Sequence, residues 1–170
     1  MLTSKGLSLV ELLVTISIIS VILSVAMPSA SRLREQQHLA SVLSDLRGGL
    51  ALTRQEAIRT GSSVSIAPSA NHWQNGWRIF RDTDHDGIWD VGEHLLREVP
   101  ALPDTLSLSS NTPLRHYIRY TPSGRATLVN GGYQMGTLSL CENTSKKGYQ
   151  LRLNNAGRFS VNPVNGCESF

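Results

Sequence analysis

The feature that most constrains this chain is an apolar segment at residues 7–27, interrupted by a single charge, Glu11. As a helix the segment would be about 31 Å long, close to the ~30 Å hydrocarbon thickness of a bilayer. Lys5 precedes it and Arg32 follows it. The pattern predicts a transmembrane helix, with Pro28 kinking or locally unwinding the chain directly after the apolar part.

The small residue of this N-terminus, Gly6, lies before the apolar segment, whereas a secretory signal places its cleavage site after it. Cleavage after Gly6 would leave the helix on the mature protein and place the new α-amino group of Leu7 about one turn from Glu11. A carboxylate in hydrocarbon is costly and is usually paired or functional. An amino group on a neighbouring copy would be a natural partner for Glu11. The alternative is a carboxylate that merely reaches the lipid headgroups.

The stretch KGLSLVELL, residues 5–13, resembles the class III leader motif of type IV pilins and type II secretion pseudopilins. The resemblance implies cleavage between Gly6 and Leu7 by a prepilin peptidase and N-methylation of Leu7. It also implies that Glu11 promotes docking into a growing filament by meeting the amino terminus of an adjacent subunit. The chain departs from the motif in having Leu7 where most members have Phe.

Residues 28–60 continue with apolar positions at helical spacing, and Gly61 is a plausible stop. The predicted core-facing stripe is Leu39, Val42, Leu43, Leu46, Leu50, Ala57 and Ile58. The remainder reads as short strands separated by Gly, Pro, Asn and Asp, predicted at 63–67, 77–81, 94–99, 105–109, 116–121, 126–129, 137–141, 149–153 and 158–162.

These patterns predict an α+β protein: one long N-terminal helix packed on a β-rich head of antiparallel strands. The expected divisions are a leader at 1–6, a transmembrane or filament-core half-helix at 7–27, an amphipathic half-helix at 28–60 and a periplasmic head at 61–170.

Four further stretches, GLALTRQEAIRTGSSVSI, NGWRIFRDTDHDGIWDVGEHLLRE, YTPSGRATLVNGGYQMGTLSLC and LNNAGRFSV, are similar in order and spacing to the GspH/FimT family. The resemblance implies a type IV pilin-like minor subunit that helps initiate or cap a filament, either a pilus or the pseudopilus of a type II secretion system. The implied partners are other minor and major pilins, a prepilin peptidase and the bacterial inner membrane. The implied location is that membrane, with a periplasmic head, and then the filament tip.

The acidic loop of residues 82–93 follows the spacing of a twelve-residue calcium loop. The oxygen ligands this spacing predicts are Asp82, Asp84, Asp86, the carbonyl of Ile88, Asp90 and Glu93. Such a loop normally joins two helices, whereas this one lies between two predicted strands. A polar hairpin loop is therefore the competing interpretation. No cofactor is required by either interpretation, and Ca²⁺ is the candidate ligand.

Two cysteines, Cys141 and Cys167, lie near the C-terminus. With an export-type N-terminus, an even count favours a disulfide, and two unrelated buried thiols are the alternative. The serines show no nucleophile elbow and the five histidines show no metal-ligand spacing. The sequence therefore predicts a subunit without enzymatic activity.

The formal net charge is +3, with no block of like charges. Some minor pilins of the FimT type bind DNA during natural transformation, and a basic C-terminal G-R-x-R motif is associated with that role. This chain has Gly157-Arg158-Phe159-Ser160, without the second arginine. Arg125, Lys146, Lys147, Arg152 and Arg158 are the candidate phosphate contacts. Scattered, solvated cations are the competing interpretation.

Overall fold

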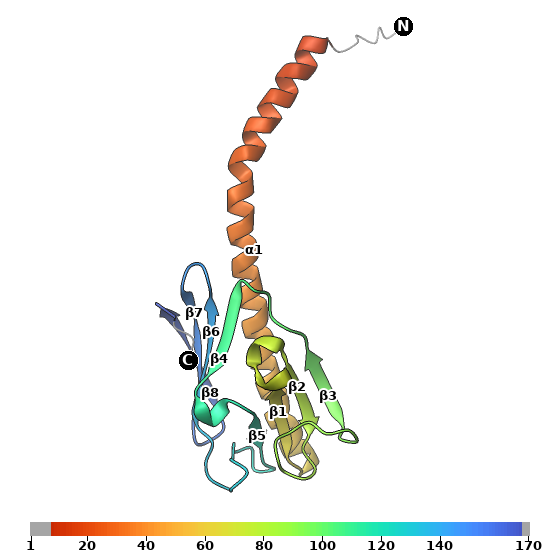
Figure 1. Cartoon of the computed structure of the whole chain (residues 1–170), viewed down its shortest axis with the longest axis vertical. Helices are drawn as coiled ribbons and strands as arrows, with labels where there is room; N and C mark the ends of the chain where they lie inside the picture. Colours follow the sequence, from red (N-terminus) through yellow and green to blue (C-terminus); the bar gives the residue numbers. More distant parts are fainter. Residues whose placement is uncertain (1–7, 168–170) are drawn as a thin grey trace. The chain divides into compact units, whose positions relative to one another are not determined.

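The computed structural model describes residues 8–167, and for residues 25–36 it describes the backbone alone. The chain divides into two compact units, Met1–Gln37 and His38–Phe170. A long helix, α1 (Leu9–Thr60), contributes to both, and all the described strands belong to the second unit (Figure 1). The predicted α+β fold, with its N-terminal helix and antiparallel head, is confirmed.

The strands form two antiparallel sheets. The first has the order β3-β2-β1-β5 and consists of β1 (Val64–Pro68), β2 (Trp77–Arg81), β3 (Leu95–Val99) and β5 (Ile118–Tyr120). The second has the order β4-β6-β7-β8 and consists of β4 (Leu106–Ser110), β6 (Gly136–Glu142), β7 (Lys147–Leu153) and β8 (Phe159–Asn165). Three short 3-10 helices lie in the connections: η1 (Ser69–Asn71), η2 (Trp73–Asn75) and η3 (Thr112–Leu114).

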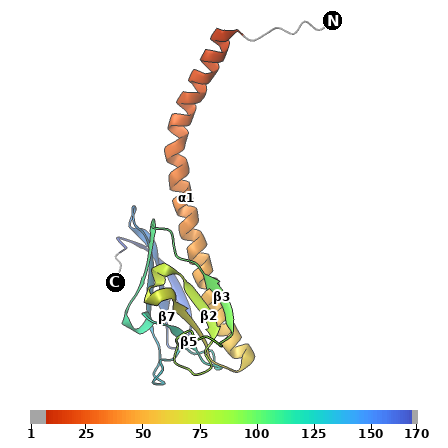
Figure 2. The same ribbon diagram turned by 45° about the vertical axis from the view of Figure 1, so that its right-hand side comes forward.

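The part of α1 beyond residue 37 packs on the head through a stripe at helical spacing (Figure 2). Leu46, Leu50 and Ala57 are buried, together with apolar side chains from both sheets. Gly49 lies on the same stripe, where an added Cβ would be 3.3 Å from Ile79 Cδ1. Because glycine has no side chain, the helix can approach the first sheet closely at this position. Gly61, at φ 64°, ends the helix in the left-handed conformation that glycine adopts without strain.

Two expectations from the sequence are wrong. Residues 126–129 form no strand, and instead make the isolated bridges Tyr120↔Ala126 and Thr127↔Tyr133. Tight turns bound the segment on both sides, closed by the bonds Gly124 N–H to Thr121 O and Gly131 N–H to Leu128 O, and leave no room for a ladder. Ile58, placed in the core stripe, is 52% exposed because it borders a surface hollow described below.

A disulfide joins Cys141 in β6 to Cys167, two residues beyond β8, with the Cα atoms 5.8 Å apart. The bond crosses over β7 and confirms the predicted pair. Gly148 of β7 lies opposite Cys141, and a Cβ there would come within 3.0 Å of the Cys167 sulfur. Glycine at this position therefore leaves room for the disulfide.

Candidate functional site

The first turns of α1 expose apolar side chains on every side of the helix. From Leu9 to Leu23, the large apolar side chains are 50–75% exposed. Four hydroxyls in the same stretch donate to carbonyls one turn earlier at 2.7–2.8 Å: Thr15 to Leu12, Ser17 to Leu13, Ser20 to Ile16 and Ser24 to Val21. A helix that is apolar all round is stable when buried among other apolar groups. With their hydroxyls bonded internally, these turns suit such surroundings.

Glu11 lies in the first turn of α1, and its side chain is exposed. No described residue of the chain pairs with this carboxylate in an ion pair. Among the described residues nothing occupies it, and a group on another molecule could reach it. The predicted cleavage site, Gly6 and Leu7, lies outside the described residues.

Helix α1 runs through Pro28 as one continuous helix, and the side chain of Pro28 lies outside the described part. The kink predicted there remains a prediction. Among the described residues, no helix is both long enough and apolar enough to cross a membrane. The transmembrane segment predicted at 7–27 includes residue 7 and the side chains of 25–27, which are not described.

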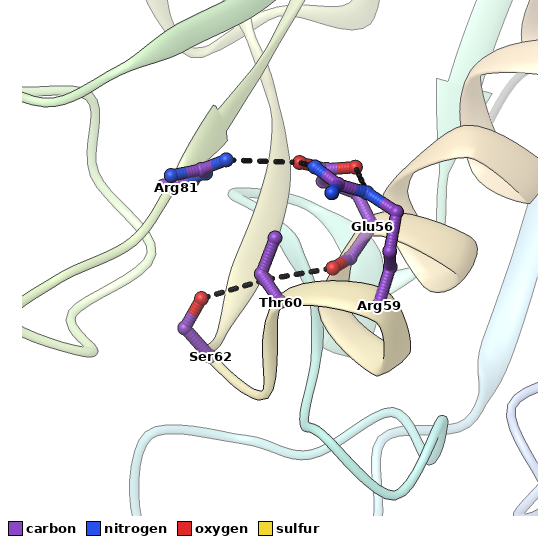
Figure 3. A network of polar contacts seen from close by, with 5 residues as sticks. All are labelled: Glu56, Arg59, Thr60, Ser62 and Arg81. Atoms are coloured by element: carbon purple, nitrogen blue, oxygen red, sulfur yellow. Dashed lines mark hydrogen bonds and ion pairs between the residues drawn. The ribbon is translucent and has the colours of Figure 1, made fainter.

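At the other end of α1, Glu56 forms a polar network that fixes the helix to the first sheet (Figure 3). Its carboxylate accepts hydrogen bonds from Arg59 at 2.6 and 2.9 Å and from Arg81 of β2 at 3.2 Å. The bonds from Arg59 hold the pKa of Glu56 at about 2, although burial opposes the shift and the pair with Arg81 adds to it. Thr60 donates to the Glu56 carbonyl, and the hydroxyls of Thr60 and Ser62 bond to each other.

The acidic loop between β2 and β3 brings Asp82, Asp84 and Asp86 together, with one carboxylate oxygen of each within 4.8 Å of the others. Asp82 is fully buried, and its Oδ2 accepts hydrogen bonds from Ser65 Oγ at 2.7 Å and from Gly87 N at 3.1 Å. Burial raises the pKa of the Asp82 carboxyl, opposed by the Ser65 bond and by the charge of Arg119.

The carboxylates of Asp90 and Glu93, which the spacing also predicts as ligands, do not join this group. Glu93 Oε1 accepts from the Thr83 backbone N–H at 2.8 Å, and Glu93 Oε2 accepts from Asp90 N–H at 3.3 Å. Glu93 therefore braces the loop across its base. The Ile88 side chain is 61% exposed, and its N–H donates to Asp86 Oδ1 at 2.6 Å.

Arg119, a buried residue of β5, holds the acidic loop to the loop that follows β5. Its Nη1 donates to His85 O, and its Nη2 donates to Leu128 O at 2.8 Å. Tyr117 reinforces the contact, because its hydroxyl accepts from Val129 N–H at 2.9 Å while its ring lies against Gly87. The two loops are thereby held as one surface.

The candidate phosphate contacts do not form one patch. Lys146 and Lys147 lie at the β6–β7 turn, whereas Arg152 and Arg158 lie near the opposite end of the β7–β8 hairpin, about 20 Å away at strand spacing. Arg125 Nη1 donates to the Tyr133 hydroxyl at 3.1 Å, with the guanidinium over the Tyr133 ring.

Arg158 lines a hollow of about 900 Å³ between α1 and the β7–β8 hairpin. Arg47 and Arg54 of α1 line the same hollow, beside the apolar Ile58 and Phe159. The structure therefore groups Arg158 with two arginines that the sequence did not single out for this role.

A long helix with an apolar N-terminal surface, followed by an antiparallel head that packs on its second half, defines a type IV pilin-like protein. The chain matches the family described as "Type II transport protein GspH" over residues 43–157 and the "Prokaryotic N-terminal methylation motif" over residues 1–27. It belongs to the GspH family.

Solved structures agree with this assignment. The type IV minor pilin FimU of Pseudomonas aeruginosa is 25% identical, with a TM-score of 0.58 over 76% of this chain and 91% of FimU. The minor pseudopilin EpsH from the type 2 secretion system of Vibrio cholerae is 15% identical, with a TM-score of 0.54 over 74% of this chain and 96% of EpsH. A comparison with curated protein sequences gives no significant match. The family and these relatives are pilins and pseudopilins rather than enzymes, in agreement with the predicted absence of enzymatic activity.

Sequence reasoning missed Glu56 and Arg119. The spacing of Glu56 and Arg59 by three residues in a helix is a usable signal for an ion pair. Nothing local marks Arg119, because it bonds to carbonyls at His85 and Leu128, and the first of these is distant in the sequence.

Proposed function

We propose that this protein is a minor pilin of a type IV pilus that helps to initiate or cap filament assembly after processing by a prepilin peptidase. The observation that carries the proposal is the apolar surface of α1 from Leu9 to Leu23, which the described residues leave exposed. This surface needs lipid before assembly and neighbouring helices after it. The 25% identity to the minor pilin FimU supports a pilus as the destination.

In this proposal, cleavage after Gly6 frees the amino group of Leu7, which is then methylated. The exposed carboxylate of Glu11, beside the apolar surface, pairs with the free amino group of an adjacent subunit. Charge pairing in an apolar environment is strong, because an unpaired charge there is costly. The pair sets the axial position of one helix against the next, and the apolar side chains then pack.

The main test is the substitution Glu11→Ala in cells that lack the native gene. We expect processed protein at normal levels and at least about tenfold less of it in sheared filaments. This loss is expected because the amino group of the adjacent subunit would be left without a partner. Ser17→Ala is the matched control, since it removes a polar atom from the same helix without removing a charge. Normal incorporation of Glu11→Ala would refute the docking role.

Processing is tested by mass spectrometry of the mature protein. We expect loss of MLTSKG and a methyl group on Leu7. An intact Met1 in membrane-extracted protein would contradict the proposed maturation.

A pseudopilin of a type II secretion system is the second candidate, favoured by the description of the matched family as a type II transport protein. Deletion of the gene distinguishes the two. Loss of surface pili with normal protein secretion supports the pilus, and the reverse supports the secretion system. The genes beside it provide an independent indication.

A DNA-binding role in natural transformation is the third candidate, favoured by the hollow that groups Arg158 with Arg47 and Arg54. Phosphate contacts predict binding that weakens steeply as salt rises. A gel shift at low salt should show retardation that Arg158→Ala reduces. Arg78→Ala is the control, because Arg78 is paired with Glu98 in the first sheet at 2.8 Å. Retardation that Arg158→Ala leaves unchanged would reject this role.

A further inference from the structure

The acidic loop contains a buried carboxylate oxygen without a hydrogen-bond donor. Asp82 is 0% exposed, and its Oδ1 accepts no hydrogen bond from any described residue. Its other oxygen is held by Ser65 and Gly87, so the carboxylate cannot turn without breaking those bonds. Leaving such an atom unpaired destabilises the fold, and more so when the group is charged. A ligand at Oδ1 would offset that cost.

Two further carboxylates converge with Asp82. One oxygen each from Asp82, Asp84 and Asp86 lies within 4.8 Å of the others, and Asp84 is exposed while Asp86 is half-buried. Oxygens on opposite sides of a Ca²⁺ ion, each bound at about 2.4 Å, are themselves about 4.8 Å apart. The three groups therefore fit around one ion, with the exposed side left to water.

We propose that this loop binds one Ca²⁺ ion through the carboxylates of Asp82, Asp84 and Asp86. The donors are all oxygen, which suits a hard cation. We choose Ca²⁺ over Mg²⁺ because Mg²⁺ requires a near-ideal octahedron at shorter distances and gives up its water reluctantly.

The proposed ligand set differs from the one that the loop spacing predicts. Glu93, at the twelfth position of the spacing, already accepts hydrogen bonds from the backbone N–H groups of Thr83 and Asp90. It closes the loop from outside the cluster and acts as a brace. Asp90 is likewise outside the group of converging carboxylates.

Arg119 provides a fixed positive charge beside the cluster without occupying it. Its Nη atoms donate to His85 O, Leu128 O and the Thr127 hydroxyl, and among the described residues it forms no ion pair with the three aspartates. The positive charge of Arg119 reduces the electrostatic attraction between the three carboxylates and a cation. With three carboxylates and this neighbour, we expect a dissociation constant of about 0.1–1 mM, the range of extracellular calcium modules.

The test is isothermal titration calorimetry of the full-length protein in detergent, after removal of metal ions, with CaCl₂ and separately with MgCl₂. We expect one Ca²⁺ per chain, a rise in melting temperature with Ca²⁺, and Mg²⁺ binding about tenfold weaker or absent. No heat and no change in melting temperature up to about 5 mM Ca²⁺ would overturn the proposal. Equal binding of Mg²⁺ would overturn the assignment to calcium.

Three variants test the ligand set. Asp84→Asn and Asp86→Asn should each weaken Ca²⁺ binding about tenfold or more, since each removes a charged ligand. They are preferred to Asp82→Asn, which also disturbs the contacts with Ser65 and Gly87. Asp104→Asn, at an exposed carboxylate outside the loop, is the matched control and should bind as the wild type does.

Glu93→Gln distinguishes the three-carboxylate site from the full calcium-loop pattern. The variant keeps one oxygen, which can still accept from the Thr83 N–H, and loses only the acceptor for the Asp90 N–H, so we expect Ca²⁺ binding within about threefold of the wild type. Loss of binding in Glu93→Gln, with the melting temperature of the metal-free protein unchanged, would overturn the proposed ligand set.

Discussion

Among single residues, Glu56 most clearly couples local sequence to tertiary structure. It is one turn from the end of α1, its side chain is 10% exposed, and it receives hydrogen bonds from a helix residue and from β2. A carboxylate buried to this extent is tolerated because two guanidinium groups hold it in its charged form. Glu56 thus fixes the end of the helix to the first sheet.

Glu56→Gln should lower the stability of the head by about 1–3 kcal/mol at pH 7, a figure reduced for the 66% exposure of Arg59. The pKa of Glu56 is about 2 in the folded protein, below its ordinary value of 4.5. Its contribution is therefore complete above about pH 5 and is lost as the pH falls through 4.5 toward 2.

Urea unfolding of both proteins at several pH values measures this difference. The difference in unfolding free energy between wild type and variant should be constant near pH 6–7. It should shrink as the pH falls below 4.5. A gap that persists unchanged at pH 3 would show that the effect has another origin.

The acidic loop shows what residue spacing can and cannot predict. Alternating aspartates predicted a cluster, and Asp82, Asp84 and Asp86 do converge. Spacing could not show that Glu93 would turn to the Thr83 backbone, because that orientation depends on how the two strands close the loop. The buried Arg119 beneath the loop comes from a strand much later in the chain, beyond the reach of any local pattern.

Among the elements, the contact between α1 and the first sheet depends on a residue with no side chain. Gly49→Val should destabilise the head by about 1–3 kcal/mol, because the added methyl groups meet Ile79 and Trp77 at distances that are already short. Gly48→Val is the matched control: the nearest atom to a Cβ there is Arg97 Nη1 at 3.9 Å, so stability should change little. Thermal melts of both variants measure the effect, and equal melting temperatures would refute the close-packing explanation.

The disulfide is the second element-level feature, since it fastens the segment after β8 to β6 across the intervening strand. Replacing both Cys141 and Cys167 by Ala should cost about 3 kcal/mol in the chain-entropy model for a loop of this size. The β8 end of the sheet should then exchange amide hydrogens faster than β4, which measures the effect by hydrogen exchange. Unchanged stability together with unchanged exchange in β8 would show that the bridge is dispensable.

Most elements were predictable because their signals are local: helical spacing of apolar residues before Thr60, and alternation bounded by turn residues in strands such as β6 and β7. Residues 126–129 have the composition of a strand and still form only isolated bridges. A strand forms only where a partner segment of sufficient length lies beside it. Here turns on both sides of residues 126–129 limit the pairing to isolated bridges. Ile58 follows the helical stripe but faces a hollow, a detail set by the path of the β7–β8 hairpin.

At the scale of the whole molecule, the core lies within one unit. The buried apolar cluster is drawn from residues beyond 38, with none from the described residues before it. A chain beginning at His38 should therefore fold alone, with a melting temperature within about 3 °C of the full-length protein in the same detergent.

A chain beginning at residue 48 is the matched control for that truncation. It lacks Leu46, which is fully buried, and should lose about 3–5 kcal/mol or fail to fold. Circular dichroism melts compare the three proteins. Loss of cooperative unfolding in the chain that begins at His38 would mean that the first unit contributes to the stability of the head.

The four back-bonded hydroxyls between Thr15 and Ser24 of α1 have a consequence for the proposed contacts between subunits. Since each of these hydroxyls donates its proton within its own helix, none is left to donate a hydrogen bond to another helix. The other side chains exposed on that surface are mostly apolar. Apolar side chains pack by shape alone, and many helices of the same length offer similar surfaces. Apart from the charge at Glu11, the helix therefore carries little information that could distinguish one subunit type from another. If the protein assembles as proposed, we infer that the heads rather than these turns of the helix distinguish one subunit type from another.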